Sequence, residues 1–153
     1  MVDGLIIRSS SIHAAGCYTS RAIRKGQKVC EYDGPRFSKK QADERYAGRD
    51  ITYLFSCTDD GTVIDGFGIA MFINHSCNPN CESESLDGRV FIRAIRDIAA
   101  DEELTYEYNL FDSDEDDADC YCGAEKCRGT MFSEEEVKKR ARKAKRAKAK
   151  LAS

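Results

Sequence analysis

The sequence predicts a mainly β fold built as a single domain. Short β-branched or aromatic runs separated by turn residues recur along most of the 153 residues, whereas helical patterns are few. A length of this order supports one modest hydrophobic core. The composition, 41% hydrophobic and 33% charged, is typical of a globular protein. The predicted strands cover residues 2–8, 28–32, 51–55, 62–64, 81–85, 89–94 and 103–108.

The remaining segments are predicted from their turn and capping residues. Residues 9–19 hold a glycine and other small residues and are therefore predicted to form a loop. The backbone of such a loop can approach a ligand closely. Ser38 can cap a helix over residues 38–48, and residues 69–73 form a second, short helix. Ser133 starts a C-terminal helix of Lys, Arg and Ala that has little to bury.

Charge divides the chain into two unequal parts. From Val137 onward there are nine basic residues and no acidic ones, which leaves 15 basic and 27 acidic residues in the rest of the chain, a net charge of −12. An acidic body favours a basic partner, and the basic tail, residues 133–153, can make weak, nonspecific contact with nucleic acid. Without interleaved aromatic residues, sequence-specific recognition is not expected. The alternative is a tail that is merely solvated.

No membrane contact is expected, because no apolar run approaches the ~20 residues of a membrane span. Residues 1–8 also lack the basic-then-apolar order of a secretory signal. Six of the eight residues in 112–119 are acidic, and this segment is predicted to be a linker.

The stretch 72–80, Phe-Ile-Asn-His-Ser-Cys-Asn-Pro-Asn, holds the densest polar chemistry of the chain. Its proline interrupts regular structure, and Asn74, His75 and Asn80 can donate and accept hydrogen bonds. These residues are therefore predicted to form the polar wall of a cofactor site. A satisfied core histidine is the alternative for His75. A nucleophilic pair of His75 and Cys77 is not expected, because no orienting carboxylate is evident.

Eight cysteines in a chain without a secretory signal indicate metal ligands and buried thiols, in a reducing compartment. The segment Cys120-Tyr-Cys122-Gly-Ala-Glu-Lys-Cys127 offers three thiolates, and tetrahedral zinc takes four ligands. Cys77 is the predicted fourth ligand because it lies in an irregular polar segment. The other four cysteines are Cys17 and Cys81, which are alternatives to Cys77, and Cys30 and Cys57, which fit core positions.

Two phenols lie on one face of the last predicted strand, Glu103-Leu-Thr-Tyr106-Glu-Tyr108. Together with Tyr53 and Tyr32, Tyr106 and Tyr108 could line an aromatic channel, and such walls attract an alkyl-ammonium group. Half-buried strand tyrosines are the alternative interpretation.

These motifs, in this order, resemble those of the SET-domain protein-lysine N-methyltransferases that carry a post-SET zinc motif. The likeness runs from about residue 7 to residue 132, nearly everything except the tail. Five blocks carry it: Gly16-Cys-Tyr18 with Ile23-Arg-Lys-Gly26 and Val29-Cys-Glu-Tyr32-Asp-Gly34; Tyr53-Leu-Phe55 with Ile64-Asp65; Asn74-His75-Ser76-Cys77-x-Pro79-Asn80; Glu103-Leu-Thr-Tyr106-Glu-Tyr108; and Cys120-x-Cys122-Gly-x3-Cys127-Arg-Gly129.

The resemblance implies a SET-domain fold of small curved β-sheets around a pseudoknot, with a post-SET zinc knuckle and a basic C-terminal helix or tail. It implies S-adenosylmethionine as methyl donor, a lysine as acceptor, and mono- or dimethylation because position 106 is a tyrosine. The acidic body indicates that this lysine belongs to a basic peptide such as a histone tail or histone-like protein. The implied site residues are Ala15, Gly16, Cys17, Tyr18, Asn74, His75 and Phe132 for the cofactor, Cys77, Cys120, Cys122 and Cys127 for zinc, Tyr108 as the catalytic tyrosine, and Tyr53 and Tyr106 along the lysine channel.

The resemblance and the charge pattern together suggest a domain division and a location. By resemblance, residues 1–111 form the SET domain and 120–132 the post-SET zinc segment; by composition, 112–119 form an acidic linker and 133–153 the basic tail. The expected location is the nucleus and chromatin for a eukaryotic or host-directed protein, and the cytoplasm otherwise.

The chain departs from the family pattern at three positions. The family usually has Gly-x-Gly where this chain has Ala14-Ala15-Gly16, and an asparagine and an arginine where it has Gly68 and Met71. These departures keep open an alternative function, a zinc-stabilised binding module that has lost catalysis and reads lysine-containing tails. A nucleic-acid-binding zinc protein is a third interpretation, which rests on the tail and the knuckle.

Overall fold

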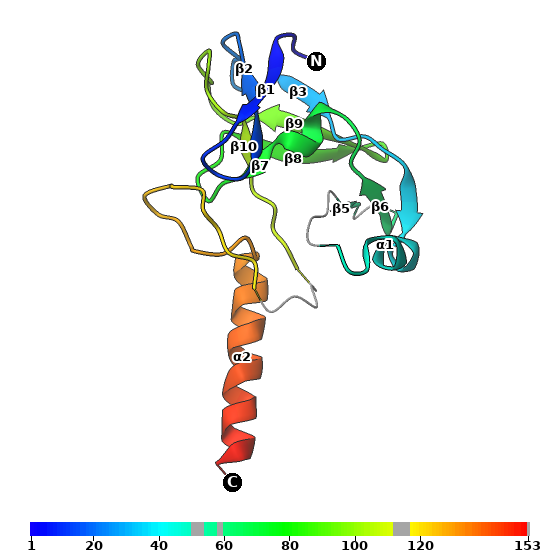
Figure 1. Cartoon of the computed structure of the whole chain (residues 1–153), viewed down its shortest axis with the longest axis vertical. Helices are drawn as coiled ribbons and strands as arrows, with labels where there is room; N and C mark the ends of the chain where they lie inside the picture. Colours follow the sequence, from blue (N-terminus) through cyan, green and yellow to red (C-terminus); the bar gives the residue numbers. More distant parts are fainter. Residues whose placement is uncertain (50–53, 58–59, 112–116, 153) are drawn as a thin grey trace.

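The computed structural model describes residues 1–49, 54–57, 60–111 and 117–152, and it confirms the mainly β fold (Figure 1). Within these residues the strands form three small sheets, and one buried core draws side chains from all three. The first sheet pairs β1 (Leu5–Ser9) with β2 (Ala15–Thr19); the second has the order β3 (Lys28–Glu31), β9 (Arg89–Ala94), β8 (Cys81–Leu86), β10 (Thr105–Tyr106), β7 (Asn74–His75); the third has the order β4 (Arg36–Ser38), β6 (Thr62–Asp65), β5 (Leu54–Ser56). The helices are α1 (Lys39–Tyr46), the 3-10 helix η1 (Ile69–Phe72) and α2 (Glu134–Leu151).

The sequence predicted one loop over residues 9–19, and this prediction is wrong for its second half. Residues 15–19 form β2, which pairs antiparallel with β1 along its whole length. Small residues conceal this strand in the sequence, but Cys17 and Thr19 are fully buried in the core. The loop is therefore confined to residues 10–14 between β1 and β2.

Short-range signals predicted the turns and caps correctly. The β8–β9 hairpin turns at Asp87 and Gly88, whose φ angles are +51° and +74°. Two consecutive positive φ angles are typical of the type I′ turn that matches strand twist. Ser38 caps α1 by accepting a hydrogen bond from the backbone N–H of Gln41, whose side chain in turn accepts from the N–H of Ser38.

The predicted hairpin of residues 51–55 and 62–64 forms in its described part. β5 and β6 pair antiparallel from Leu54 to Ser56. Residues 50–53, which hold the start of the predicted strand and Tyr53, lie outside the described residues, and so do residues 58–59 of the predicted turn.

The segment 103–108 changes partners halfway, so the strand that it forms is shorter than predicted. Glu103 forms an antiparallel bridge with Tyr18 of β2. The next two residues after Leu104 form β10, which runs parallel to both of its neighbours, β7 and β8. The register places β10 directly against the Asn74-His75 pair. The polar stretch and the tyrosine segment thus lie side by side.

Asn80 fixes the backbone of residues 103–105, where the chain passes from β2 to β7 and β8. Its side chain is 2% exposed. Oδ1 accepts a hydrogen bond from the backbone N–H of Thr105 at 2.9 Å, and Nδ2 donates to the carbonyl of Glu103 at 2.8 Å. One amide therefore satisfies a backbone donor and a backbone acceptor on either side of Leu104, where the chain passes from one sheet to the next.

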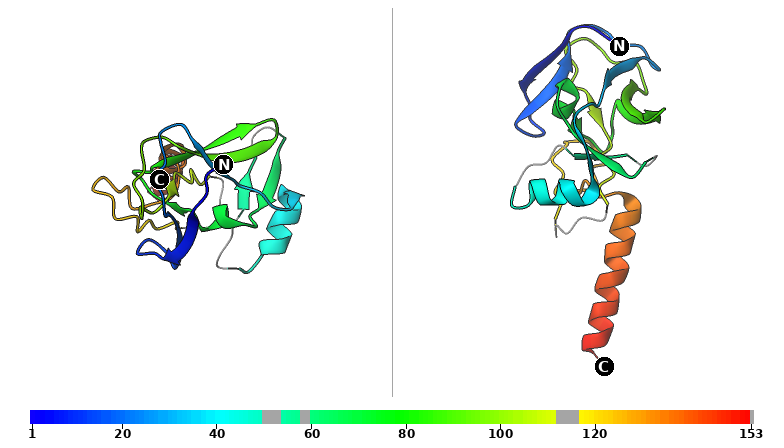
Figure 2. Two further views of the ribbon diagram at one scale, coloured as in Figure 1. Left: turned by 90° about the horizontal axis from the view of Figure 1, so that it is seen from above. Right: turned by 90° about the vertical axis from the view of Figure 1, so that its right-hand side faces the viewer.

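α2 projects away from the sheets (Figures 1 and 2). Ser133 caps its first turn by accepting a hydrogen bond from the N–H of Glu136 at 3.1 Å. Every residue from Ala141 to Ala152 is exposed, as expected for a helix with little to bury. Among the described helices, none combines the length and the apolar character that a membrane span requires.

Replacing Asn80 by Ala is expected to lower the free energy of unfolding by about 3 kcal/mol, because two buried backbone groups lose their partners. Urea denaturation of the metal-loaded protein measures this loss. Asn78→Ala is the matched control at an exposed position, where a change within about 0.5 kcal/mol is expected. Equal effects of the two substitutions would contradict the role given to Asn80.

Candidate active site and metal centre

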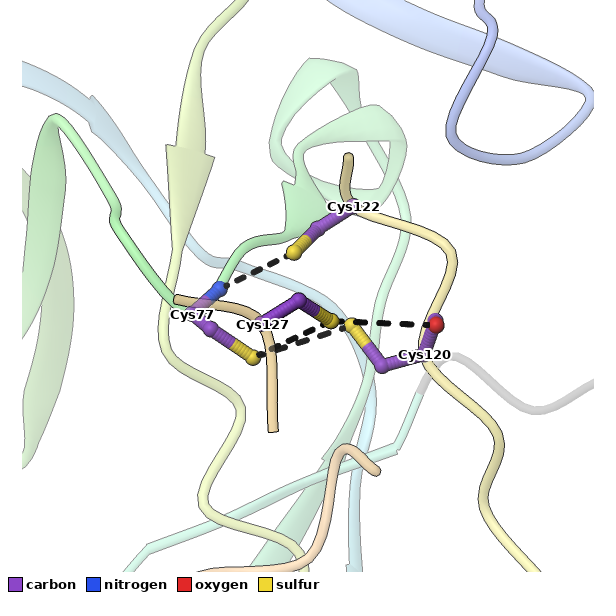
Figure 3. A group of neighbouring side chains, drawn as sticks. All are labelled: Cys77, Cys120, Cys122 and Cys127. Carbon is purple, nitrogen blue, oxygen red and sulfur yellow. Dashed lines mark hydrogen bonds between the residues drawn. The ribbon is translucent and has the colours of Figure 1, made fainter. Parts of the chain in front are cut away.

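Four cysteine thiols meet at one point between the polar stretch and the C-terminal knuckle (Figure 3). The Sγ atoms of Cys77, Cys120, Cys122 and Cys127 all lie within 4.8 Å of one another. Cys77 Sγ lies 3.8 Å from that of Cys120 and 3.9 Å from that of Cys127. Zinc–sulfur bonds of ~2.3 Å in a tetrahedron require sulfur separations of about 3.8 Å. The predicted set of four thiols is thus brought together with the geometry of a structural zinc site.

Backbone amides donate to several thiols of this cluster and favour the thiolate form of Cys122, whereas burial raises the pKa of Cys77 and Cys120. The N–H of Arg128 donates to Cys77 Sγ at 3.4 Å, and that of Gly129 donates to Cys127 Sγ at 3.3 Å. Burial raises the pKa of Cys122, but hydrogen bonds from the backbone of Cys77 and Ala124 outweigh it and lower this pKa to about 6. Such donors stabilise negative charge, which is the form that binds metal.

Cys17 and Cys81, the alternatives to Cys77, lie elsewhere. Both are fully buried in the core, and burial raises the pKa of each thiol to about 12. Buried neutral thiols suit packing rather than metal binding. Cys30 is likewise buried with a pKa raised to about 12 by burial, and Cys57 is also buried, so the two predicted core thiols are confirmed.

His75 links the cluster to the tyrosine segment. Its ring is 2% exposed. Nδ1 accepts a hydrogen bond from the backbone N–H of Tyr108 at 3.1 Å, and Nε2 faces Cys77 Sγ at 3.5 Å. Burial lowers the pKa of His75, so the ring is neutral, with its proton on Nε2 toward the sulfur.

A carboxylate does lie beside His75, which corrects the expectation that none is near. Glu107 Oε1 is 3.3 Å from His75 Nδ1. Glu107 also holds the guanidinium of Arg128 through two hydrogen bonds of 2.8 and 2.9 Å. The sulfur of Cys77 nevertheless belongs to the four-thiol cluster. The Arg128–Glu107 pair therefore ties the knuckle to the tyrosine segment rather than completing a nucleophilic triad.

Glu103 organises the N-terminal loop, a role that was not predicted from the sequence. Its carboxylate accepts hydrogen bonds from Ser10 Oγ at 2.7 Å, Tyr18 Oη at 3.0 Å and Asn74 Nδ2 at 2.9 Å. Asn74 Nδ2 also lies 3.1 Å from the carbonyl oxygen of Ala15. The only signal in the sequence was a carboxylate at the start of a predicted strand, next to the buried Leu104.

Ala14 is the last residue of this loop, and Gly16 lies two residues later, in β2. A Cβ at Gly16 would lie 2.2 Å from Glu103 Oε1, so only glycine fits there. Ala14 has a φ of +36°, in the left-handed region that favours glycine. The alanine that replaces the first glycine of the family pattern is accommodated with a strained backbone.

Aromatic side chains gather beside β10. The rings of Tyr106 and Tyr108 lie 4.9 Å apart between centroids, and Phe55 lies 6.4 Å from Tyr106 and 5.1 Å from Tyr32. Tyr108 Oη donates to the carbonyl of Ile73 at 2.8 Å. Phe55 was not assigned to this cluster from the sequence, and the predicted member Tyr53 lies outside the described residues.

Phe132 lies at the base of α2. Its ring is 5% exposed, and the guanidinium of Arg140 lies over it at 3.9 Å from the centroid. Leu110 pairs with Phe132 in a parallel bridge. Phe132 thus joins the C-terminal segment to the chain that follows Tyr108.

The purified protein is expected to contain one zinc ion per chain, since four thiolates at this spacing form a closed site. Cys77→Ser is expected to lose the ion and to become more sensitive to proteolysis after residue 111. Atomic absorption and limited proteolysis measure the two effects. The control is Cys57→Ser, outside the cluster. Full zinc retention by Cys77→Ser would remove Cys77 from the ligand set.

Ala14→Gly is expected to raise the free energy of unfolding by up to about 1 kcal/mol. Relief of left-handed strain is worth about 1–2 kcal/mol, and the added glycine entropy offsets about half of it. Ala15→Gly, within β2, is the matched control and is expected to destabilise. Thermal denaturation of both variants decides: equal destabilisation would show that Ala14 is not strained.

Comparison with known proteins places this site in a family. The sequence matches the SET domain family over residues 14–109. The histone-lysine N-methyltransferase, H3 lysine-4 specific, of Aspergillus fumigatus is 42% identical over 137 residues, which cover 80% of this chain and 11% of the relative. The protein of the same name in Saccharomyces cerevisiae is 42% identical over 137 residues (80% and 12%), and that in Candida albicans is 40% identical over 136 residues (80% and 13%). The chain spans about a tenth of the length of these curated relatives. The chain belongs to the SET-domain family.

Proposed function

We propose that the chain is an S-adenosylmethionine-dependent protein-lysine N-methyltransferase that acts on a histone H3 tail or a similar basic protein. One observation carries the proposal: the β7–β10 pairing sets the Asn74-His75 pair against the Tyr106–Tyr108 segment, beside the four-thiol cluster. Relatives named as histone-lysine N-methyltransferases support it. The alternative of an inactive reader of lysine-containing tails is not favoured by these names.

The proposed cofactor site is the N-terminal loop with the polar stretch. Asn74 binds the loop through the carbonyl of Ala15 and through Glu103, which keeps the backbone from Ala15 to Tyr18 in place. The side chain of Cys17 is buried, so its part in binding would be played by its backbone. The full proposed set is Ala15, Gly16, Cys17, Tyr18, Asn74, His75 and Phe132. When bound, S-adenosylmethionine supplies a sulfonium methyl group.

The aromatic cluster is the proposed lysine channel, with Tyr53 as a further member. A lysine amine must lose its proton to attack, although its free pKa is ~10.4. Removal from water by these rings lowers that pKa. Tyr108, whose hydroxyl is fixed on the carbonyl of Ile73, would orient the amine, and positioning supplies most of the rate. Burial raises the pKa of Tyr106, so its hydroxyl stays protonated and can restrict the methylated amine.

The proposed metal is zinc, held by Cys77, Cys120, Cys122 and Cys127. It would have a structural role, since four protein ligands leave no open position for a substrate. The proposed partner is a basic tail, because the chain outside the C-terminal tail carries a net charge of −12. The corresponding location is chromatin, and a zinc–thiolate site requires a reducing compartment.

The test is methyl transfer from labelled S-adenosylmethionine to a panel of histone H3 peptides and basic proteins, read by mass spectrometry. The wild-type chain is expected to give mono- or dimethyl-lysine. Tyr108→Phe is expected to lower the rate by about 100-fold through lost orientation. Tyr106→Phe is expected to shift the product toward trimethyl-lysine, because the channel gains room.

Calorimetry of cofactor binding separates the negative outcomes. No transfer with the cofactor bound would mean that the panel lacks the substrate. No transfer and no cofactor binding would favour the inactive binding module. An unchanged product after Tyr106→Phe would remove Tyr106 from control of the methylation degree.

A further inference from the structure

We propose that α2 is a docking surface for double-stranded nucleic acid, which it contacts through phosphates without reading sequence. The proposal concerns a surface outside the site described above and does not require methyl transfer. Nine basic residues and no acidic ones follow Val137. The structure places them on a single projecting helix (Figure 1).

The charge density of α2 approaches that of a duplex. The basic residues run from Lys138 to Lys150, a span of about 18 Å at the helical rise of ~1.5 Å per residue. Lys139 and Arg140 pair with Glu136, and the other seven charges give about one positive charge per 2.6 Å. Duplex DNA carries one negative charge per ~1.7 Å of its axis. A helix lying along a duplex would therefore neutralise more than half of the phosphate charge beside it.

The charges form one broad face of the helix. At ~3.6 residues per turn, most of the basic side chains fall on about half of the circumference, opposite a strip that holds Val137, Ala141, Ala144, Ala147 and Leu151. Three of these five residues are alanines, which offer a partner helix little apolar surface to bury. A major groove ~12 Å wide accepts a helix of ~10–12 Å diameter and surrounds it with phosphates.

The helix is anchored at its base and exposed to solvent beyond it. Glu136, 6% exposed, pairs with Arg140 at 2.9 Å, and Arg140 lies over the ring of Phe132. From Ala141 to Ala152 every residue is exposed. The helix projects away from the acidic body (Figures 1 and 2), so its basic side chains are accessible to a partner. The interleaved alanines keep the helix slender enough to approach phosphates closely.

The experiment uses the full chain and a fluorescein-labelled 30-base-pair duplex of mixed sequence, with anisotropy measured from 50 to 200 mM KCl. Binding is expected to be independent of sequence. If six side chains contact phosphates, the slope of log K against log salt is about −5. A quadruple variant, K143Q/K145Q/R146Q/K148Q, is expected to bind at least 10-fold more weakly at 50 mM KCl, with a slope that is shallower by about 4.

Three controls make the outcome decisive. K143R/K145R/K148R conserves charge and should bind like the wild type. A144P keeps the charge but breaks the helix, and is expected to bind several-fold more weakly. Equal duplex binding by wild type and the quadruple variant overturns the proposal, and so does equal binding by A144P. Tighter binding of a labelled polyglutamate peptide than of the duplex assigns α2 to an acidic protein instead. Methyl transfer to an H3 peptide by the same preparations tests the proposed function separately.

Discussion

The structure depends on one parallel contact, the pairing of β10 with β7. Parallel strands cannot be joined by a tight turn, and here the connection contains the whole β8–β9 hairpin. The entropy of closing such a loop grows only slowly with its length, so the difficulty is register rather than reach. Asn80 solves it, because its buried amide binds Thr105 and Glu103 at fixed spacing. A slip by one residue would turn Tyr106 away from its aromatic neighbours.

The cysteine cluster joins the C-terminal segment of residues 120–127 to the chain that follows β7. Cys77 is the second residue after β7, while its three partners come from the segment Cys120–Cys127. A divalent cation held by these four cysteines would couple the folding of this region to metal binding. His75 faces both Cys77 and Tyr108. The proposed metal centre and the tyrosine segment are thus linked through one buried side chain.

The sequence predicted local features such as helix caps and tight turns, but it did not predict which distant segments pair with one another. Ser38 and Asp87-Gly88 were assigned correctly because caps and tight turns depend on a few neighbouring residues. Cys77 was chosen over Cys17 and Cys81 because it lies in a polar segment. β2 was missed because its small residues form a strand only against β1. The sequence did not reveal that Glu103 pairs with β2 while β10 pairs with β7 and β8, because these pairings involve segments distant in sequence.

The same limit applies to the candidate site. Glu103 was not assigned a role, since its partner Ser10 comes from the far end of the chain, and no spacing rule connects them. Glu107 was overlooked beside His75 for the same reason. The roles of all the proposed cofactor-binding, lysine-channel and zinc-binding residues remain predictions. What the sequence does specify is the chemistry of each segment, and the fold decides which chemistries meet.

The acidic body and the basic helix would neutralise each other if they were in contact, so the distance between them matters. A helix of 18 residues extends about 27 Å, several times the Debye length of ~8 Å at physiological salt. The distal basic residues are therefore screened from the acidic body and would repel a basic peptide little. If α2 lay on the body, each surface would neutralise the other. The contacts among Glu136, Arg140 and Phe132 at the base of the helix hold the two surfaces apart, which is what the proposed binding of a polycation by the body and of a polyanion by the helix requires.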